Sequence, residues 1–550
     1  MRNYIFRGGI SAIAVITLVL TAHPALAATC ESLADLHLPD TTITSAVSVT
    51  PPATIKNPMG KADVTTPFCR VIGVLAPTSD SQIGFEVWLP PADTWNHKFF
   101  AVGNGGFAGA VNYREMMPGF ERGYATMTSD KGHVNPADNP VENISWALGH
   151  PEKIIDYDYR AAHVTTVAAK QIIEAYYGSA PQHSYYSGCS GGGHQGVTET
   201  TRYPGDYDGY ILGDAARNHI EVDMDGLWDV LAASLSDPAN AIKPPQLALV
   251  HQAVMKKCAG KDGGLESDGF LTDPRMCQFD PKELECKAGQ DASTCLTPGQ
   301  VVGLKKIYEG PTNPRTHEQI DFGYPMGTEI LFMNFIGKTN PAGFERPWAG
   351  ILTYMVFDDP NYMANERYLK FNFDTDYKLL MNKPVGNQTL WSIFDNDNPN
   401  LEPIKKEGAK IIHYWGWMDG NDTVLHGLEY YDRVVANQAK LHHLKPEEAA
   451  RETSDFYRLF LVPGMGHCGG GPGPNVFDTL TPLEKWVEGG VAPDKIVATK
   501  YVDNNPKQAV QMTRPVCPYP QFARYTGSGS TTSAENFVCA EGVKSAAKEK

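Results

Sequence analysis

Short apolar runs alternate with amphipathic stretches between about residue 68 and residue 216. The apolar runs contain valine and aromatic residues and stop at proline or glycine, a pattern that predicts strands, whereas helical spacing of apolar positions predicts helices. On these grounds we expect strands at 84–89, 98–102, 184–187 and 207–212, and helices at 157–177 and from the glycine-rich stretch after residue 187 to Arg202.

This alternation is lost between about residues 217 and 400 and then resumes. The later part predicts strands at 410–414 and 457–462 and helices at 425–438 and 480–487. Strands that alternate with helices predict a mostly parallel sheet covered on both faces. We therefore expect an α/β core in two parts, 28–216 and 401–550, interrupted by an inserted lid domain at 217–400. The lid carries six conspicuous aromatic residues: Trp228, Trp348, Phe357, Phe371, Phe373 and Trp391.

The first 27 residues have the features of a secretory signal peptide. Arg2 and Arg7 precede a short apolar segment, and Ala25-Leu26-Ala27 provides the small residues of a cleavage site. No other stretch approaches the roughly 20 apolar residues that a membrane helix needs. We expect a secreted or periplasmic protein. Its formal net charge of -16 argues against nucleic acids and anionic membranes as partners.

All ten cysteines follow this segment, and export favours their oxidation to disulfides. Many pairings are formally possible, but short separations along the chain favour four local pairs. Cys189 and Cys468 are then left over. The expected disulfides are Cys30–Cys69, Cys258–Cys277, Cys286–Cys295, Cys517–Cys539 and Cys189–Cys468.

Gly188-Cys189-Ser190-Gly191-Gly192 matches the G-x-S-x-G pattern of a nucleophile elbow. In an α/β-hydrolase this pattern places a serine on a sharp turn between a strand and a helix, and both are predicted here. A serine hydroxyl needs a base to remove its proton and an acid to orient that base. We therefore expect an α/β-hydrolase core with Ser190 as its nucleophile.

The acid and the base of such an enzyme follow the serine, each in a loop after a core strand. Asp419 lies just beyond the strand that ends at residue 414, and His467 just beyond the strand that ends at residue 462. We expect these two residues to complete the triad. Asp422 remains an alternative acid.

Two backbone N–H groups are expected to form the oxyanion hole. One belongs to Gly191, the residue after the nucleophile, and the other comes from the loop after an early strand. The glycine-rich stretch 103–107 fits that loop, since glycine allows close approach of the backbone. Gly106 is the preferred donor and Gly105 the alternative.

Other histidines and cysteines permit different interpretations. His194 follows Ser190 by one helical turn, and we expect a packing or capping role for it, as we do for His413 within a strand. Two thiolates and two imidazoles from Cys189, His194, His467 and Cys468 are a conceivable zinc site, but their spacing matches no common zinc pattern. A nucleophilic Cys189 would sit one residue away from the apex of the elbow.

The adjacent Cys189-Ser190, the separate Asp419 and the adjacent His467-Cys468 together resemble the CS-D-HC arrangement of the tannase and feruloyl esterase family. Residues 103–109, 401–419 and 514–520 are also similar to that family, and the resemblance covers nearly the whole mature chain. It implies hydrolysis of esters of aromatic acids, such as galloyl, hydroxycinnamoyl or hydroxybenzoyl esters. The lid aromatics are chemically suited to hold a planar acyl group.

The resemblance also implies a structural calcium ion in the lid, within a loop between Cys258 and Cys277. Asp262 and Asp268 match ligand positions of the family, and oxygen ligands suit this hard cation. Ala259 stands where the family has its first aspartate. The alternative is an Asp-Gly turn closed by a disulfide. No organic cofactor is implied.

Two alternatives to an aromatic-acid esterase remain open from the sequence. One is a carboxylesterase for other aromatic or polyester-derived esters, such as a terephthalate monoester. The other is a secreted binding protein that keeps the fold without turnover, although an intact candidate triad argues against it. The expected partner is a small aromatic ester, and the oligomeric state is left open.

Overall fold

The structure, a computed structural model, describes residues 28–139, 141–215, 217–235, 240–334 and 347–542. The expected signal peptide, residues 1–27, lies outside the described residues. Within them, no helix has the length and apolar character needed to cross a bilayer.

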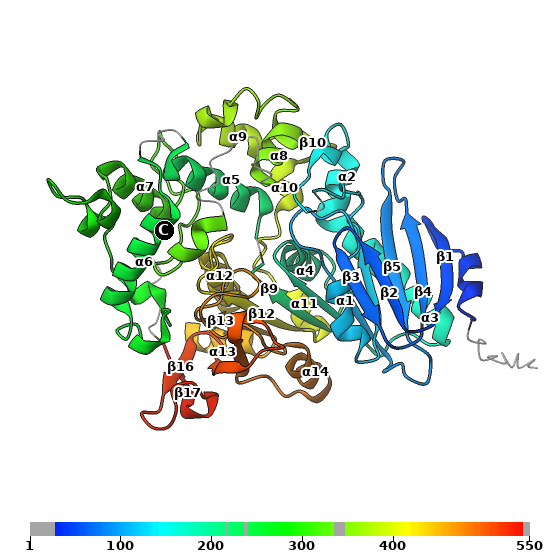
Figure 1. Ribbon diagram of the computed structural model, residues 1–550. Helices are drawn as coiled ribbons and strands as arrows, with labels where there is room; N and C mark the ends of the chain where they lie inside the picture. Colours follow the sequence, from blue (N-terminus) through cyan, green and yellow to red (C-terminus); the bar gives the residue numbers. More distant parts are fainter. Residues whose placement is uncertain (1–27, 140, 216, 236–239, 335–346, 543–550) are drawn as a thin grey trace, which may run out of the picture.

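A nine-stranded sheet forms the centre of the molecule, in the order β1-β4-β5-β7-β6-β8-β9-β12-β13 (Figure 1). The six strands from β7 to β13 in this order pair in parallel, whereas β1, β4, β5 and β7 pair antiparallel. The expected parallel sheet is therefore confirmed, with an antiparallel extension at one edge. The strands are β1 (Thr41–Val49), β4 (Phe68–Leu75), β5 (Ile83–Leu89), β6 (Lys98–Val102), β7 (Ala125–Ser129), β8 (His183–Cys189), β9 (Gly209–Gly213), β12 (Lys410–Gly416) and β13 (Tyr457–Val462).

Helices cover both faces of this sheet. Successive residues of each strand point to opposite sides, so buried strands present apolar side chains to the helices on both faces. In β12, Ile411 packs in the cluster that contains residues of α3 and α12, while Ile412 packs in the cluster that contains residues of α1 and α14. The core helices are α1 (Tyr113–Phe120), α2 (Pro151–Ile155), α3 (Ala161–Tyr177), α4 (Gly191–Arg202), α11 (Glu402–Glu407), α12 (Leu425–His442), α13 (Pro446–Ser454) and α14 (Leu480–Gly489).

The described residues between 217 and 400 add no strand to the central sheet. Figure 1 shows their helices, green to yellow-green, grouped together beside the sheet. The helices are α5 (His219–Val230), α6 (Pro244–Cys258), α7 (Pro298–Glu309), α8 (Pro347–Gly350), α9 (Thr375–Met381) and α10 (Leu390–Phe394), and a short hairpin is formed by β10 (Pro384–Val385) and β11 (Gln388–Thr389).

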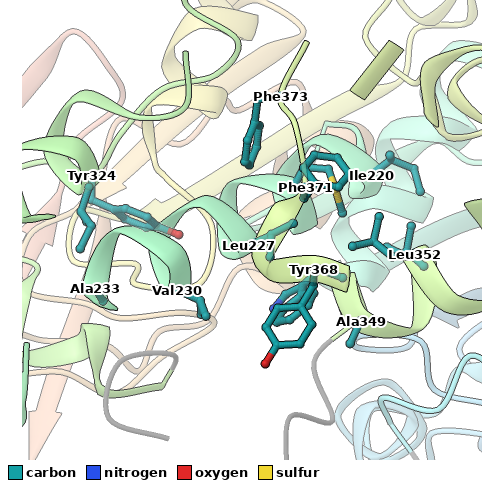
Figure 2. Packing of buried hydrophobic residues seen from close by; sticks show 14 of the residues in the cluster. Ile220, Leu227, Val230, Ala233, Tyr324, Ala349, Leu352, Tyr368, Phe371 and Phe373 are labelled. Carbon is teal, nitrogen blue, oxygen red and sulfur yellow. The ribbon is translucent and has the colours of Figure 1, made fainter. Parts of the chain in front are cut away.

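These helices share a hydrophobic core, which also takes in residues of the first core segment: Phe107, Ile144, Ala147, Ile154, Ile155 and Tyr157. Figure 2 shows residues of this core, among them Leu227 and Val230 of α5 and the aromatic side chains of Tyr368, Phe371 and Phe373. All six lid aromatics named above belong to this cluster or pack against it. Their first role is therefore to stabilise the lid, and only Trp348 among them also lines the pocket described below.

Short strand pairs and disulfides complete the fold. The strand pairs are β2 (Ala53–Asn57) with β3 (Gly60–Val64), β14 (Ile496–Tyr501) with β15 (Val510–Val516), and β16 (Gln521–Tyr525) with β17 (Phe537–Glu541). All ten cysteines are paired, in the five combinations expected from the sequence: Cys30–Cys69, Cys189–Cys468, Cys258–Cys277, Cys286–Cys295 and Cys517–Cys539.

Candidate active site

Ser190 occupies a sharp turn between β8 and α4. Its backbone has φ 60° and ψ -127°, a conformation that is strained for a residue with a side chain. The turn is possible because its neighbours are glycines: a Cβ atom on Gly188 would lie 2.3 Å from the carbonyl oxygen of Gly192. The strand, the helix and the glycines thus present the Ser190 hydroxyl at the carboxyl end of the sheet.

The three residues expected to form a triad are joined by hydrogen bonds. His467 Nε2 lies 2.8 Å from Ser190 Oγ, and His467 Nδ1 lies 2.8 Å from Asp419 Oδ2. Asp419 is 1% exposed, and its carboxylate also accepts hydrogen bonds from Trp415 Nε1 and from the backbone N–H of Asn421. A fixed carboxylate, an imidazole and a hydroxyl therefore stand in the order that nucleophilic catalysis requires.

Asp422, the alternative acid, is engaged elsewhere. Its Oδ1 lies 2.7 Å from Nδ1 of His426, and Nε2 of the same imidazole lies 2.6 Å from Asp321. Asp422 thus orients a second histidine, and of the two aspartates it is Asp419 that forms a hydrogen bond with His467.

The environment of His467 favours its protonated form. Burial opposes a charge on the imidazole, but Asp419, Asp214 and Asp422 outweigh it and raise the pKa of His467 to about 9. A histidine with a raised pKa is a strong general base once it is deprotonated.

Gly106 and Gly191 lie against each other beside Ser190. A Cβ atom on Gly191 would be 3.1 Å from the backbone nitrogen of Gly106, so the two backbones approach closely. Gly106 has φ +50° and lines the same pocket as Ser190, while Gly105 does not line it. Tyr157 Oη donates a 3.0 Å hydrogen bond to the Gly106 carbonyl and holds this loop in place.

A cavity of about 130 Å³ opens in front of Ser190 and His467. Core and lid both contribute to its wall, since α5 and the start of α8 face the oxyanion loop and the turn after β12. The remaining lining residues are Gly106, Phe107, Glu142, His219, Val222, Asp223, Gly226, Pro347, Trp348, Asn421 and Asp422. Aromatic walls beside a nucleophile suit a planar acyl group.

The Cys189–Cys468 disulfide connects the residue before Ser190 to the residue after His467. Its Cα atoms are 5.9 Å apart across a sequence separation of 279 residues. Because both sulfur atoms are in this bond, neither is a thiolate, which excludes the zinc arrangement and a Cys189 nucleophile in this structure.

The other histidines have structural partners. His194 is buried with Nε2 2.7 Å from Asp158 Oδ1, and its ring stacks on His219 at 4.5 Å. His413 is buried with Nδ1 2.8 Å from Tyr457 Oη, and burial lowers its pKa to about 3. Both histidines therefore have the packing roles expected for them.

The comparison with known proteins places this geometry in a family. A family model described as tannase and feruloyl esterase matches residues 69–540. The chain belongs to the tannase and feruloyl esterase family. An uncharacterized esterase of Xanthomonas campestris pv. campestris is 38% identical over 97% of this chain and 95% of its own length.

Two further members of the tannase and feruloyl esterase family are more distant. Mono(2-hydroxyethyl) terephthalate hydrolase of Piscinibacter sakaiensis is 30% identical over 86% of this chain and 84% of its own. The crystal structure of feruloyl esterase B from Aspergillus oryzae superposes with a TM-score of 0.80 at 27% identity, covering 93% of this chain and 99% of that one. These relatives establish an esterase with the α/β fold of the family, acting on small-molecule esters.

The family resemblance also implied a calcium ion held by Asp262 and Asp268. As these two aspartates are arranged in the structure, they do not fit such an ion. The Asp268 carboxylate accepts two hydrogen bonds from the Arg514 guanidinium, at 3.0 and 3.1 Å, and both side chains are buried. Asp262 accepts hydrogen bonds from the backbone N–H groups of Gly264 and Thr272. Among the described residues, neither aspartate belongs to a group of three possible ligands close enough to share an ion. A guanidinium supplies the positive charge at Asp268, and calcium stays an untested prediction.

Several residues of this tannase and feruloyl esterase site were not singled out from the sequence. Tyr157, Asp158 and His219 support the oxyanion loop and the elbow helix through contacts between segments distant in the chain. Asp214 follows β9 directly and contacts the turns of the triad. Its position after a core strand was a signal in the sequence, because catalytic groups of this fold also follow core strands.

Proposed function

We propose that the protein is a secreted serine esterase that hydrolyses esters of aromatic acids. The observation that carries this proposal is the continuous hydrogen-bond chain Asp419–His467–Ser190, with two contacts of 2.8 Å, at the wall of a pocket shared by core and lid.

The proposed reaction has two steps. His467 takes the proton of Ser190 Oγ, which attacks the ester carbonyl carbon, and the backbone N–H groups of Gly191 and Gly106 stabilise the resulting oxyanion. The carbon–oxygen bond to the alcohol then breaks, and the alcohol leaves with the proton from His467. Water, deprotonated by His467, releases the aromatic acid and restores Ser190. Asp419 holds the imidazole in the required tautomer throughout.

The aromatic acid is supported by the family and by the pocket. The family model names tannases and feruloyl esterases, and aromatic side chains of Phe107 and Trp348 line the cavity. The terephthalate hydrolase of Piscinibacter sakaiensis favours a second candidate, an esterase for terephthalate monoesters. Parallel kinetics on methyl gallate, methyl ferulate, methyl p-coumarate and the terephthalate monoester distinguish these substrates.

Replacement of Ser190 tests the chemistry. We expect Ser190→Ala to retain the fold and the five disulfides while kcat falls by about 10⁴- to 10⁶-fold, because the nucleophile is lost. A fluorophosphonate probe is expected to label the wild type at Ser190 and to leave the variant unlabelled. Near-normal turnover in Ser190→Ala would refute the mechanism, and an unlabelled, inactive wild type would favour the binding-protein alternative.

Secretion is supported by the five disulfides, which persist in oxidising compartments. Expression of the full chain with detection of the mature protein outside the cytoplasm, together with its N-terminal sequence, tests export and cleavage near Ala28.

A further inference from the structure

Asp214 is a fully buried carboxylate that the two-step mechanism does not use. It is the first residue after β9, the strand that lies between β8, which leads to Ser190, and β12, which leads to Asp419. Its backbone φ is +37°, in the left-handed region that residues other than glycine rarely adopt. Such a conformation persists only where the surrounding contacts impose it.

Those contacts connect Asp214 to the turns that carry Asp419 and His467. Asp214 Oδ1 accepts a 2.8 Å hydrogen bond from the backbone N–H of Gly416, three residues before Asp419. Asp214 Oδ2 accepts a 3.0 Å hydrogen bond from the backbone N–H of Cys468, the residue after His467. One side chain therefore fixes the backbone on which the acid and the base are mounted.

The backbone around Asp214 extends this connection to the nucleophile. Its own N–H donates to the Tyr414 carbonyl at 2.9 Å, and the carbonyl of the preceding Gly213 accepts a 3.0 Å hydrogen bond from the Ser190 N–H. The turns that carry Ser190, Asp419 and His467 thus meet at residues 213 and 214.

We propose that Asp214 is a positioning residue that holds the Asp419 and His467 turns in register with Ser190. This inference rests on the proposed triad mechanism. Asp214 contacts no reacting atom and acts through the backbone of its neighbours. A displacement of about 1 Å between reacting groups can cost about 100-fold in rate, so fixing these turns directly supports proton transfer from Ser190 to His467.

Electrostatics supports the same assignment. Asp214 is one of the carboxylates that raise the pKa of His467, after Asp419. The carboxylates that raise the pKa of His467 are those of Asp419 and Asp422, from the turn after β12, and of Asp214 after β9, while His467 in turn contributes to lowering the pKa of the buried His219 on α5. Burial and the neighbouring Asp419 in turn raise the pKa of Asp214 itself well above its ordinary range.

Asp214→Asn tests the proposal with little change of shape. The amide keeps one acceptor oxygen but turns an NH₂ group toward the second backbone N–H, so one of the two hydrogen bonds is lost. We expect kcat to fall about 10- to 100-fold with KM within about threefold, and the acid limb of kcat/KM to move to lower pH. Circular dichroism and thiol titration check that the fold and the disulfides remain.

Asp130→Asn is a matched control. Asp130 is likewise the first residue after a sheet strand, β7, and accepts two backbone hydrogen bonds, from Gly84 and Gly132, each at 2.9 Å, but both end on the same oxygen, Oδ1. Because the amide oxygen of asparagine can accept both bonds, we expect this variant to stay folded, with kcat and its pH profile within about twofold of the wild type.

The inference is refuted if Asp214→Asn keeps the wild-type kcat and pH profile, or if Asp130→Asn lowers kcat as much as Asp214→Asn does. If Asp214→Asn does not fold, Asp214→Ser, which is smaller and keeps one acceptor, is held to the same criteria. Ser190→Ala separates the two proposals. Substantial activity in Ser190→Ala refutes the triad mechanism itself. If Ser190→Ala is inactive and Asp214→Asn is unaffected, only the role of Asp214 is refuted.

Discussion

Asp419 and Asp422 lie three residues apart, and both are buried, yet only Asp419 forms a hydrogen bond with the imidazole of His467. The difference lies in the direction of each carboxylate. The backbone N–H groups of Asn421 and Asp422 both donate to Asp419 Oδ1, which leaves Asp419 Oδ2 directed at His467. Asp422 instead pairs with His426.

The same residues determine how activity depends on pH. The base works only when His467 is neutral, and nearby carboxylates raise its pKa to about 9. Asp214 and Asp422 contribute while they are ionised, and burial raises the pKa of each of them as well. We therefore expect kcat/KM to rise with pH along a limb with a midpoint above 6.5, the ordinary imidazole value, and no higher than about 9.

This pH profile is best measured with methyl cinnamate, an aromatic-acid ester that has no group titrating in this range, and with stability monitored at each pH. The midpoint reports the free enzyme. A limb centred at or below pH 6.5 would contradict the electrostatic environment described for His467.

The Cys189–Cys468 disulfide acts at the level of elements, because it joins the end of β8 to the turn after β13. We expect Cys189→Ala/Cys468→Ala to lower kcat about tenfold or more while cooperative unfolding persists, since the loops of nucleophile and base lose their connection. The loss of stability in the chain-entropy model is roughly 5 kcal/mol at most, and other crosslinks reduce it. Kinetics and thermal unfolding of the double variant check both effects.

Cys30→Ala/Cys69→Ala is the control, because that disulfide joins the N-terminal segment to β4, away from the triad. It is expected to lower the Tm without loss of kcat. Full turnover in Cys189→Ala/Cys468→Ala would mean that its disulfide serves stability alone.

The nature of the buried side chains explains part of which elements could be predicted from the sequence. The strands that became β5, β6, β8, β9, β12 and β13 were recognised because their runs are apolar. β7 was not predicted because three of its five residues, Thr126, Thr128 and Ser129, are hydroxyl-bearing yet buried. β1 and β4 were not predicted either, although the sequence of β4, FCRVIGVL, is mostly apolar. The helix expected from residue 157 begins as α3 at Ala161, since a π-helical turn occupies 156–160.

The same limit applies to the site. Motif, chain order and strand context identified Ser190, Asp419 and His467 as candidates because each follows a core strand. Asp158 and His219 were missed because their roles arise from contacts over long sequence separations. Local patterns carry no information on such contacts.

At the scale of the whole molecule, the lid is attached to the core by buried or half-buried arginines. Arg202, at the end of the elbow helix, donates to the carbonyl groups of Ser392, Ile393 and Asp395. Arg514, on β15, pairs with Asp268 in the lid loop. The pocket is lined by residues of both the core and the lid, so its shape depends on both parts of the chain.

The Arg514–Asp268 pair predicts how the protein responds to chelators. We expect EDTA to leave the Tm unchanged, because a guanidinium neutralises Asp268. Arg514→Met leaves a buried carboxylate without its partner, which costs about 3–5 kcal/mol of stability and lowers the Tm by several degrees. Differential scanning calorimetry measures both.

In Arg514→Met/Asp268→Asn the unpaired charge is gone, and part of the lost stability is expected to return. A large fall of the Tm in EDTA, reversed by added calcium, would instead favour a calcium ion in the lid loop.

The long separation between Cys189 and Cys468 has a consequence for biosynthesis. Four disulfides close within 39 residues or fewer, whereas Cys189 waits for a partner 279 residues later. If the chain is exported N-terminus first, as proposed, Cys189 meets six other cysteines, from Cys30 to Cys295, before Cys468 emerges. Correct pairing then relies on thiol–disulfide exchange, so the yield of active enzyme from a recombinant host depends on its disulfide isomerase.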